Sequence, residues 1–315
     1  MTASGQKVAI VGAGRVGSTL AYRLAAGRLC SEVVLVDGDQ RRAWAEAADL
    51  QHALSAEDNA VRVREGSYYD CADAAVCVVT AGVRFAPNTP RLEQMDRAAT
   101  AMGRIVPSVM GAGFDGVFLV VSRPVDLMTW LVQQLSGLPD SRVLGTGTVL
   151  DTARLRCYLA SALQVDVQSV SALVMGEHGE DRVIPWSQVT VDGTPLEVLL
   201  RQSPDRLPGF DRDAAINTVA DIAYNLASVK GETSFGIASA AAGIVASILR
   251  DEGRVMTVSA MLSGQYGQED VYAGVPAEIG AGGVRRVVEY PLTAEELAQF
   301  GRAVRDLREY MTDIS

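Results

Sequence analysis

The chain contains only two histidines, and histidine is the side chain whose charge changes near neutral pH. His178 stands in MGEHGED between Gly176 and Gly179, which is typical of an irregular loop set by close backbone packing. His52 stands in DLQHA inside a helical pattern, and we interpret it as a helix-surface or helix-packing side chain. A loop histidine taken alone is more often structural than catalytic, so the case for His178 depends on its neighbours.

Asp151 and Arg154 stand in TVLDTARLR, at the beginning of a predicted helix over residues 149–163. A spacing of three places both side chains on one face of that helix. An aspartate beside a histidine fixes the ring tautomer and favours its protonated form, and an arginine can bind a carboxylate through two parallel hydrogen bonds. The alternative is an ordinary first-turn aspartate paired with an arginine of the same helix, and spacing alone favours that alternative.

The segment RFAPNTPR, residues 84–91, contains two further arginines. It follows a predicted buried strand and the turn Ala81–Gly82, and a helical pattern resumes at Leu92. Its arginines, Arg84 and Arg91, could fold over a bound anion. A solvated surface loop is the alternative interpretation.

Three glycines, Gly12, Gly14 and Gly17, form G-x-G-x-x-G directly after a predicted strand and at the start of a helix. Such glycines permit a tight turn and a close approach of the backbone to a pyrophosphate, which the helix N-terminus then faces. Asp37 ends the next strand, where an acid meets the adenosine ribose hydroxyls and repels a 2′-phosphate. The motif therefore predicts NAD, and the alternative for Asp37 is a turn cap. The further expected cofactor-binding residues are Arg15, Val16, Thr80, Ala81, Gly82 and Ser122.

The elements that would position these residues follow an α/β pattern. Continuous Val-rich runs at 7–11, 32–37, 75–80 and 117–122 indicate strands buried on both faces, with helical patterns at 18–26 and 41–54 between them. The later region has helical patterns at 149–163 and 213–229 and an antiparallel-looking segment at 183–191. We expect an N-terminal Rossmann domain with a doubly wound parallel sheet over residues 1–145. A C-terminal α+β catalytic domain is expected over residues 146–315.

Composition narrows the possible partners. The formal charge is −10 and no block of Lys or Arg occurs, so we expect no nucleic acid, and an anionic substrate would need a local arginine cluster. Residues 233–249 carry no charge but are shorter than a membrane span, which predicts a buried helix and no membrane partner. The four cysteines show neither metal-like nor paired spacing, and the N-terminus does not resemble an export signal. We expect a cytoplasmic protein without a metal site.

Several longer motifs occur in one order along the whole chain: VAIVGAGRVGSTLAY, VVTAG, PRLE, GTGTVLDTAR, MGEHGE, KGETSFGIA and SGQYGQEDVYAGVP. With them the chain resembles the L-lactate/malate dehydrogenase family. Trp186 in VIPWSQV and the run GQYGQEDVY make it more similar to the bacterial lactate branch. The resemblance implies an NAD-dependent dehydrogenase acting on the CH–OH group of an L-2-hydroxy acid. It also implies a homodimer or homotetramer.

The resemblance further implies a role for individual residues. His178 would take the hydroxyl proton during oxidation and return it during reduction, and Asp151 would orient and stabilise the imidazolium. Arg154 would bind the substrate carboxylate, while Arg91 would polarise the carbonyl group as its loop closes and excludes water. Thr233 would line the substrate pocket.

Two residues depart from the family pattern. Phe85 stands where lactate enzymes have Gln and malate enzymes have Arg, so the substrate side chain is expected to be apolar or small. Arg123 stands where the family motif S-N-P-V-D has Asn, which contacts the reacting oxygen. Arg123, Arg91 and Arg154 would together surround one carboxylate. Their charges would disfavour a protonated His178 unless another anion is present.

Three consequences of Arg123 remain open at this point. In the first, Arg123 points away and pairs with an acid, leaving a weakened lactate-type enzyme that reduces pyruvate or a larger apolar 2-oxo acid. It binds a second anionic group, so that the substrate is a dianionic, malate-like or phosphonate 2-oxo acid. Or it has removed activity, leaving an NAD-binding homologue. We rank the three in this order, because a binding module has no need of His178, Asp151, Arg154 and Arg91 together.

Overall fold

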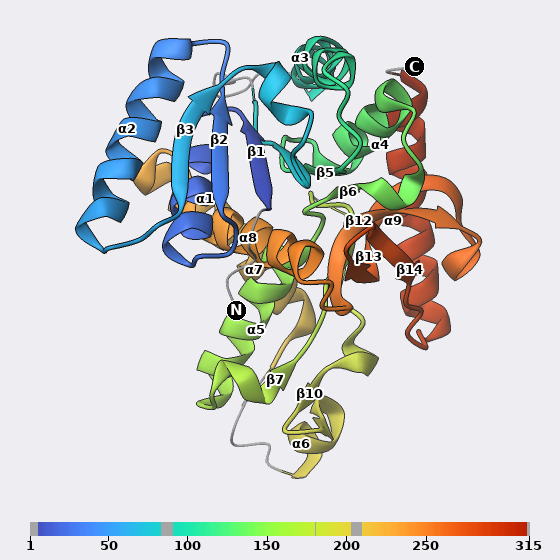
Figure 1. Ribbon diagram of the computed structural model, residues 1–315. Helices are drawn as coiled ribbons and strands as arrows, with labels where there is room; N and C mark the ends of the chain where they lie inside the picture. The colour runs from blue at the N-terminus through green and yellow to red at the C-terminus, as the bar shows by residue number, and fades with distance from the viewer. Residues whose placement is uncertain (1–5, 83–90, 180, 203–209, 314–315) are drawn as a thin grey trace.

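The computed structural model of the protein describes residues 6–82, 91–179, 181–202 and 210–313 (Figure 1). The N-terminal half forms a parallel sheet with helices packed against it, and the C-terminal half continues from the end of that sheet. In Figure 1, α5, β7, β10 and α6 lie below the sheet, while α9 stands at the opposite side of the molecule from α2. The predicted α/β fold class is confirmed.

The parallel part of the sheet has the order β3-β2-β1-β4-β5-β6. Its strands are β1 (Lys7–Val11), β2 (Glu32–Val36), β3 (Arg62–Gly66), β4 (Val76–Val79), β5 (Val117–Val120) and β6 (Val143–Gly145). Strands β1, β4 and β5 are buried along their whole length, as continuous apolar runs predict for strands covered on both faces. The strand order reverses between β1 and β4, and ligands of such sheets bind at the carboxyl ends of the strands at that point.

Four helices accompany these strands: α1 (Arg15–Ala26), α2 (Gln40–Ala56), α3 (Arg91–Gly111) and α4 (Val125–Ser136). Helix α1 begins at Arg15, three residues before the predicted start, because the glycine turn leads directly into it. Helix α2 begins after Asp39, whose carboxylate accepts hydrogen bonds from the backbone N–H groups of Arg41 and Arg42. His52 lies exposed on α2, which agrees with the helix-surface interpretation and not with the helix-packing one.

Long antiparallel strands extend the same sheet into the C-terminal half, and the sequence patterns did not predict them. Strand β12 (Arg254–Ser263) pairs with β6 where Ser259 faces Gly145, and β13 (Glu269–Gly280) pairs with β12 and β14 (Gly283–Val287). Short strands β8 (Met175–Gly176) and β9 (Arg182–Val183) complete this edge. The sheet is therefore continuous between the two halves.

The predicted antiparallel segment at 183–191 is divided between two sheets. Its first part is β9, and η4 (Trp186–Gln188) separates it from β10 (Thr190–Val191). Strand β10 pairs with β7 (Val170–Ser171) and β11 (Thr194–Pro195) in a separate three-stranded sheet. Trp186 belongs to a small second core beside this sheet.

The remaining helices are α5 (Val149–Leu163), α6 (Leu196–Gln202), α7 (Arg212–Lys230), α8 (Phe235–Leu249) and α9 (Ala294–Asp313). Helix α5 has the predicted bounds. Helix α8 is buried only in part: residues 244–249 belong to the core, whereas Phe235 is exposed. The predicted buried helix is therefore confirmed over its C-terminal part, whereas its N-terminal end at Phe235 is exposed. In the part of the chain that the structure describes, no helix is long and apolar enough to cross a membrane.

Candidate active site

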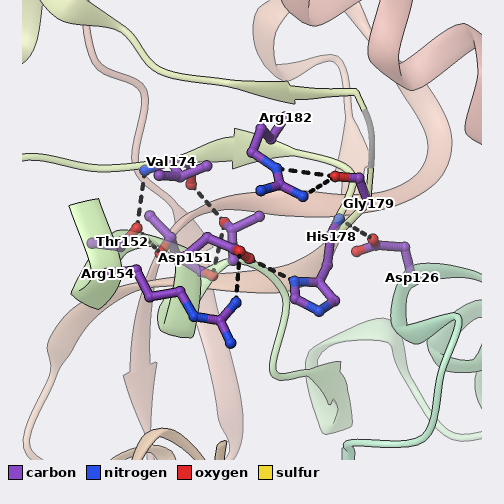
Figure 2. A network of polar contacts seen from close by, with 10 residues as sticks. Asp126, Asp151, Thr152, Arg154, Val174, His178, Gly179 and Arg182 are labelled. Carbon is purple, nitrogen blue, oxygen red and sulfur yellow. Dashed lines mark hydrogen bonds and ion pairs between the residues drawn. The ribbon is translucent and has the colours of Figure 1, made fainter. Parts of the chain in front are cut away.

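The structure brings His178 and Asp151 together from two separate elements (Figure 2). Nδ1 of His178 lies 2.5 Å from Oδ2 of Asp151, which stands buried in the first turn of α5. Burial raises the pKa of this carboxyl, but the charge and hydrogen bond of His178 and the charges of Arg182 and Arg154 outweigh it, so the pKa of Asp151 is lowered. Asp151 is therefore a carboxylate at neutral pH and can hold the Nδ1–H tautomer of the ring.

Arg154 lies one turn further along α5 and also faces Asp151. Its Nη1 is 3.5 Å from Oδ1 of Asp151, so the aspartate contacts the histidine with one oxygen and the arginine with the other. Burial lowers the pKa of Arg154, Asp151 raises it, and the nearby charges of Arg182 and Arg123 lower it further. The helical Asp–Arg pair and the His–Asp contact thus occur together, in one cluster.

The turn from β6 into α5 and the strand before His178 are tied to each other by hydroxyl groups. Thr148 donates from Oγ1 to the carbonyl of Val174 at 2.5 Å, and Oγ1 of Thr152 accepts from the N–H of Val174 at 2.9 Å (Figure 2). Thr148 and Thr152 flank Asp151 in sequence. These two bonds fix the distance between the aspartate and the segment that carries the histidine.

The loop that carries His178 begins at Gly176, whose φ is +86°. A Cβ at this position would lie 2.8 Å from the carbonyl oxygen of Asp181, so the turn requires glycine. Arg182 donates from Nε to the carbonyl of Gly179 at 3.0 Å and contacts the same oxygen through Nη2. Arg182 therefore closes the loop and places a positive charge above the His178–Asp151 pair (Figure 2).

Sequence reasoning missed one carboxylate of this site, that of Asp126. It stands in the first turn of α4, is 1% exposed, and accepts a hydrogen bond from the backbone N–H of His178 at 3.1 Å. Burial raises the pKa of Asp126 to about 6. The signal in the sequence was an isolated acid inside the apolar stretch VFLVVSRPVDLMTWLV, because a charged residue there is buried with the helix that contains it. Arg182 was missed as well.

Arg123 is exposed at the carboxyl end of β5. It makes no hydrogen bond or ion pair with residues 6–82, 91–179, 181–202 or 210–313, so the interpretation in which it pairs with an acid has no support among those residues. Its charge nevertheless lowers the pKa of Arg154, which places it near the cluster.

The structure describes only some of the other predicted substrate residues. Arg84 and Phe85 lie outside the described residues. Arg91 is the first residue of α3, and only its backbone is described. Thr233 lies half-buried in the turn between α7 and α8, and the neighbouring Glu232 forms an ion pair with Arg15 at 2.7 Å. This ion pair joins the substrate-side turn to the first helix after the glycine motif.

The glycine turn has the geometry that a dinucleotide requires. Gly12 has a φ of +114°, and a Cβ there would lie 2.6 Å from the N of Ala81; a Cβ at Gly17 would lie 1.9 Å from the carbonyl oxygen of Gly12. At Gly14 the nearest such atom is 4.0 Å away, so the space in front of the turn is open to a ligand. Thr80 donates to the carbonyl of Gly12 at 2.8 Å and fixes the turn against β4.

Asp37 lies at the end of β2, at the same edge of the sheet as the glycine turn. Its Oδ2 accepts from the N–H of Ala13 at 2.7 Å and its Oδ1 from the N–H of Asp39 at 2.9 Å. Asp37 therefore caps the turn after β2, as the alternative interpretation expected, and also binds the distant glycine turn, but each oxygen keeps a free lone pair for a ribose hydroxyl. The two functions are compatible, and the residues present fit NAD.

Two family models together match nearly the whole chain. The lactate/malate dehydrogenase NAD binding domain matches residues 6–145, and the lactate/malate dehydrogenase alpha/beta C-terminal domain matches residues 148–315. These matches confirm the expected family and NAD as the cofactor.

Relatives and solved structures agree with the family models. The chain is 41% identical to L-lactate dehydrogenase 3 of Bacillus cereus and covers 98% of both chains; it is 39% identical to L-lactate dehydrogenase 1 of Bifidobacterium longum, again over 98% of both. The crystal structure of minor L-lactate dehydrogenase from Enterococcus mundtii in its ligands-bound form is 40% identical over 98% of each chain, with a TM-score of 0.95. The chain therefore belongs to the lactate/malate dehydrogenase family of NAD-dependent oxidoreductases.

Proposed function

We propose that the chain reduces pyruvate, or a 2-oxo acid with a larger apolar side chain, to the L-2-hydroxy acid with NADH. The observation that carries this proposal is the contact of Asp151 with both His178 and Arg154, because it places a proton donor beside a carboxylate-binding group. The L-lactate dehydrogenases that are about 40% identical over almost the full chain support the same substrate class.

His178 is the residue that we assign to proton transfer in this reaction. Asp151 occupies Nδ1, which leaves Nε2 as the ring atom that exchanges a proton with the substrate. In reduction, protonated His178 gives the Nε2 proton to the carbonyl oxygen, and the Asp151 carboxylate stabilises the imidazolium before that transfer. The bound cofactor supplies the hydride, which ends on C2 of the substrate.

Arginines and the turn before α8 would hold the substrate. We assign the carboxylate of the 2-oxo acid to Arg154, whose guanidinium offers two parallel donors. Arg91 would polarise the carbonyl group, and Thr233 would line the pocket. Phe85 would face the substrate side chain, since a phenyl ring accepts an apolar group and strongly disfavours an unpaired carboxylate.

We assign the cofactor to residues 1–145 and the substrate chemistry to residues 146–315. Gly12, Gly14 and Gly17 with the N-terminus of α1 would hold the pyrophosphate, and Asp37 would bind the adenosine ribose. The remaining residues assigned to the cofactor are Arg15, Val16, Thr80, Ala81, Gly82 and Ser122. Among them, Ser122 donates to the carbonyl of Ala81 at 2.5 Å, which fixes one wall of the proposed cofactor site.

A second candidate function is reduction of a dianionic 2-oxo acid, with Arg123 binding the second anionic group. The observation that favours it is that Arg123 is exposed near Arg154 and has no charged partner among the described residues. An unpaired guanidinium at that position is available to a dicarboxylate or a phosphonate.

One substrate panel separates these functions: NADH oxidation with pyruvate, longer apolar 2-oxo acids, phenylpyruvate, oxaloacetate and phosphonopyruvate. We expect turnover of pyruvate or of the apolar acids. Turnover of the dianionic acids alone would instead establish the second candidate. Absence of turnover with every acid, together with tight NADH binding, would show a catalytically inactive NAD-binding homologue.

We also propose that the chain assembles as a homodimer or homotetramer. Three large apolar side chains are exposed near the junction of α7 and α8: Val229 is 90% exposed, Phe235 67% and Leu226 49%. A second copy that covers them would remove this apolar surface from water. Sedimentation equilibrium tests the assembly, and a monomer at all concentrations would exclude it.

A cytoplasmic location is proposed on the basis of the cysteines. All four are free thiols, and three of them, Cys30, Cys71 and Cys77, are buried. Free thiols in a chain of this size are typical of a reducing compartment. Cell fractionation with an antibody against the protein would test the location, and recovery outside the cytoplasm would contradict it.

A further inference from the structure

A second buried carboxylate, that of Asp126, lies beside His178 on the side opposite Asp151 (Figure 2). Asp126 belongs to α4, and its Oδ2 accepts the backbone N–H of His178 across 52 residues of sequence. His178 is thus held twice, by Asp151 at the ring and by Asp126 at the backbone.

The buried position of Asp126 disfavours the ionised form of its carboxyl group. Burial raises the pKa of Asp126 to about 6, while the Ser259 hydroxyl, the N–H of His178 and the His178 charge lower it, and Asp151 raises it. Within the described part of the chain, neither Oδ1 of Asp126 nor Oγ of Ser259 makes a well-aligned hydrogen bond, and both are buried. A charge in such surroundings destabilises a fold unless a neighbouring charge benefits from it. The imidazole of His178 is the neighbour that benefits.

Several charged groups surround the contact between Asp126 and His178. They are Glu177 on the loop after β8, Asp151 and Arg154 on α5, Arg182 on β9 and Arg123 just before α4, while β12 contributes the neutral Ser259. Positive charges disfavour a protonated imidazole and negative charges favour it. The carboxylate of Asp151 contacts the ring at Nδ1. Asp126 is a further anion, in contact with the backbone N–H of the histidine.

We propose that Asp126 is a positioning residue that acts through His178. Its carboxylate accepts a hydrogen bond from the backbone N–H of His178 and so keeps the ring in position beside Asp151. Its negative charge favours the protonated form of the ring, whose proton is used in the reduction. The proposal rests on the proposed reduction of a 2-oxo acid by this site. It assigns to α4 a direct part in setting the pH range over which the site works.

The sign of the effect follows from the charges. Reduction needs a proton on His178, so the rate falls as pH rises and the ring loses that proton. Removal of the Asp126 charge makes the protonated ring less favourable, so the ring loses its proton at a lower pH. The alkaline fall of the reduction rate then begins at a lower pH.

Two substitutions separate the charge of Asp126 from its hydrogen bond. Asp126→Asn removes the charge but keeps an oxygen that can accept the N–H of His178, whereas Asp126→Leu removes both. Thr129→Val is a matched control, because Thr129 is fully buried on the same helix and its hydroxyl donates to the carbonyl of Val125 within α4, away from His178.

The kinetic experiment measures kcat/KM for the best 2-oxo acid across pH with saturating NADH. We expect the alkaline limb of Asp126→Asn to move to lower pH by about half a unit to one unit. Asp126→Leu should lose about 100-fold in kcat at every pH while its affinity for NADH changes by less than about two-fold. Thr129→Val should follow the parent profile.

A measurement without turnover tests the same proposal. Because the chain has only two histidines, a His52→Gln background leaves His178 as the single imidazole, and its ring can be titrated by NMR with NADH bound. We expect Asp126→Asn to move the titration midpoint of that ring to lower pH. This readout stands even if none of the tested acids is reduced, so failure of the proposed function and failure of this inference are distinguishable.

An Asp126→Asn variant whose pH profile and ring titration both coincide with those of the parent would overturn the proposal. In that case a uniform loss of activity across pH would identify Asp126 as a structural residue only. A limb that moved to higher pH would contradict the proposal equally.

Discussion

Oδ2 of Asp151 and Nδ1 of His178 lie 2.5 Å apart although 27 residues separate them in the chain. The aspartate is placed by the first turn of α5, and the histidine by the loop between β8 and β9. Two hydrogen bonds join these two elements directly beside the pair: the Thr148 hydroxyl donates to the carbonyl of Val174, and the N–H of Val174 donates to Oγ1 of Thr152. The contact between Asp151 and His178 is therefore set by the backbone framework, and the predictions below change one part of the site at a time.

Asp151→Asn should impair the chemical step and leave cofactor binding intact. The amide cannot hold the Nδ1–H tautomer or stabilise the imidazolium as the carboxylate does, so we expect kcat to fall about 100-fold or more. Steady-state kinetics together with NADH titration measures both effects. Asp58→Asn is the matched control, because Asp58 is exposed with a φ of +50°, which Asn also tolerates. Equal losses in both variants would contradict the assigned role of Asp151.

Arg154→Lys should weaken substrate binding. Lysine keeps the charge but lacks the planar fork, so KM for the 2-oxo acid is expected to rise about 10-fold to 100-fold with little change in NADH affinity. Arg156→Lys, two residues along α5, is the control: Arg156 donates to the carbonyls of Val170 and Val167 instead of facing Asp151. An unchanged KM in Arg154→Lys would remove Arg154 from the substrate site.

Arg123→Asn should raise turnover of pyruvate, because one positive charge that acts on Arg154 and disfavours a protonated His178 is removed. Rates with pyruvate and with oxaloacetate, measured in parallel, check this expectation. A drop confined to oxaloacetate and other dianionic acids would instead identify Arg123 as the residue that selects the substrate.

Asp126→Asn should change stability in a pH-dependent way. The pKa of Asp126 is about 6 in the folded chain and near 3.9 in an unfolded one, so the stability associated with its protonated form is present at low pH and lost as pH rises through about 6. Asparagine does not titrate. The free energy of unfolding of the variant, compared with the parent, should therefore increase between about pH 5 and pH 8 by about 1 to 1.5 kcal/mol. Urea unfolding at both pH values tests this, and a pH-independent difference would contradict it.

Local patterns predicted the cofactor half well. The glycine turn after β1 and Asp37 at the end of β2 are joined by short-range geometry, and Val-rich runs mark strands buried on both faces. Helix α5 was also predicted with its bounds, because a strand end, a glycine and a continuous helical pattern delimit it. The assignment of His178, Asp151 and Arg154 to catalysis stays a prediction until the variants are measured.

Contacts between distant segments could not be read from local patterns. Asp126 contacts His178 only because α4 and the β8–β9 loop come together in the folded chain. The local sequence of neither segment predicts this contact. Strands β12 and β13 are paired antiparallel in the same sheet as the parallel strands, a register set by tertiary packing. Phe85, which the sequence predicts to bear on substrate choice, lies outside the described residues, so its part in selection stays a prediction.

The central claim is that His178 passes the proton in a reduction of a 2-oxo acid by NADH. Its most direct test compares NADH oxidation with pyruvate by the parent chain, His178→Gln and His52→Gln, at equal saturation with NADH. His52 is the matched control, since it is the only other histidine and lies exposed on α2. We predict parent-like rates for His52→Gln and a loss of about 1000-fold for His178→Gln with unchanged NADH affinity. Full activity in His178→Gln would contradict the account.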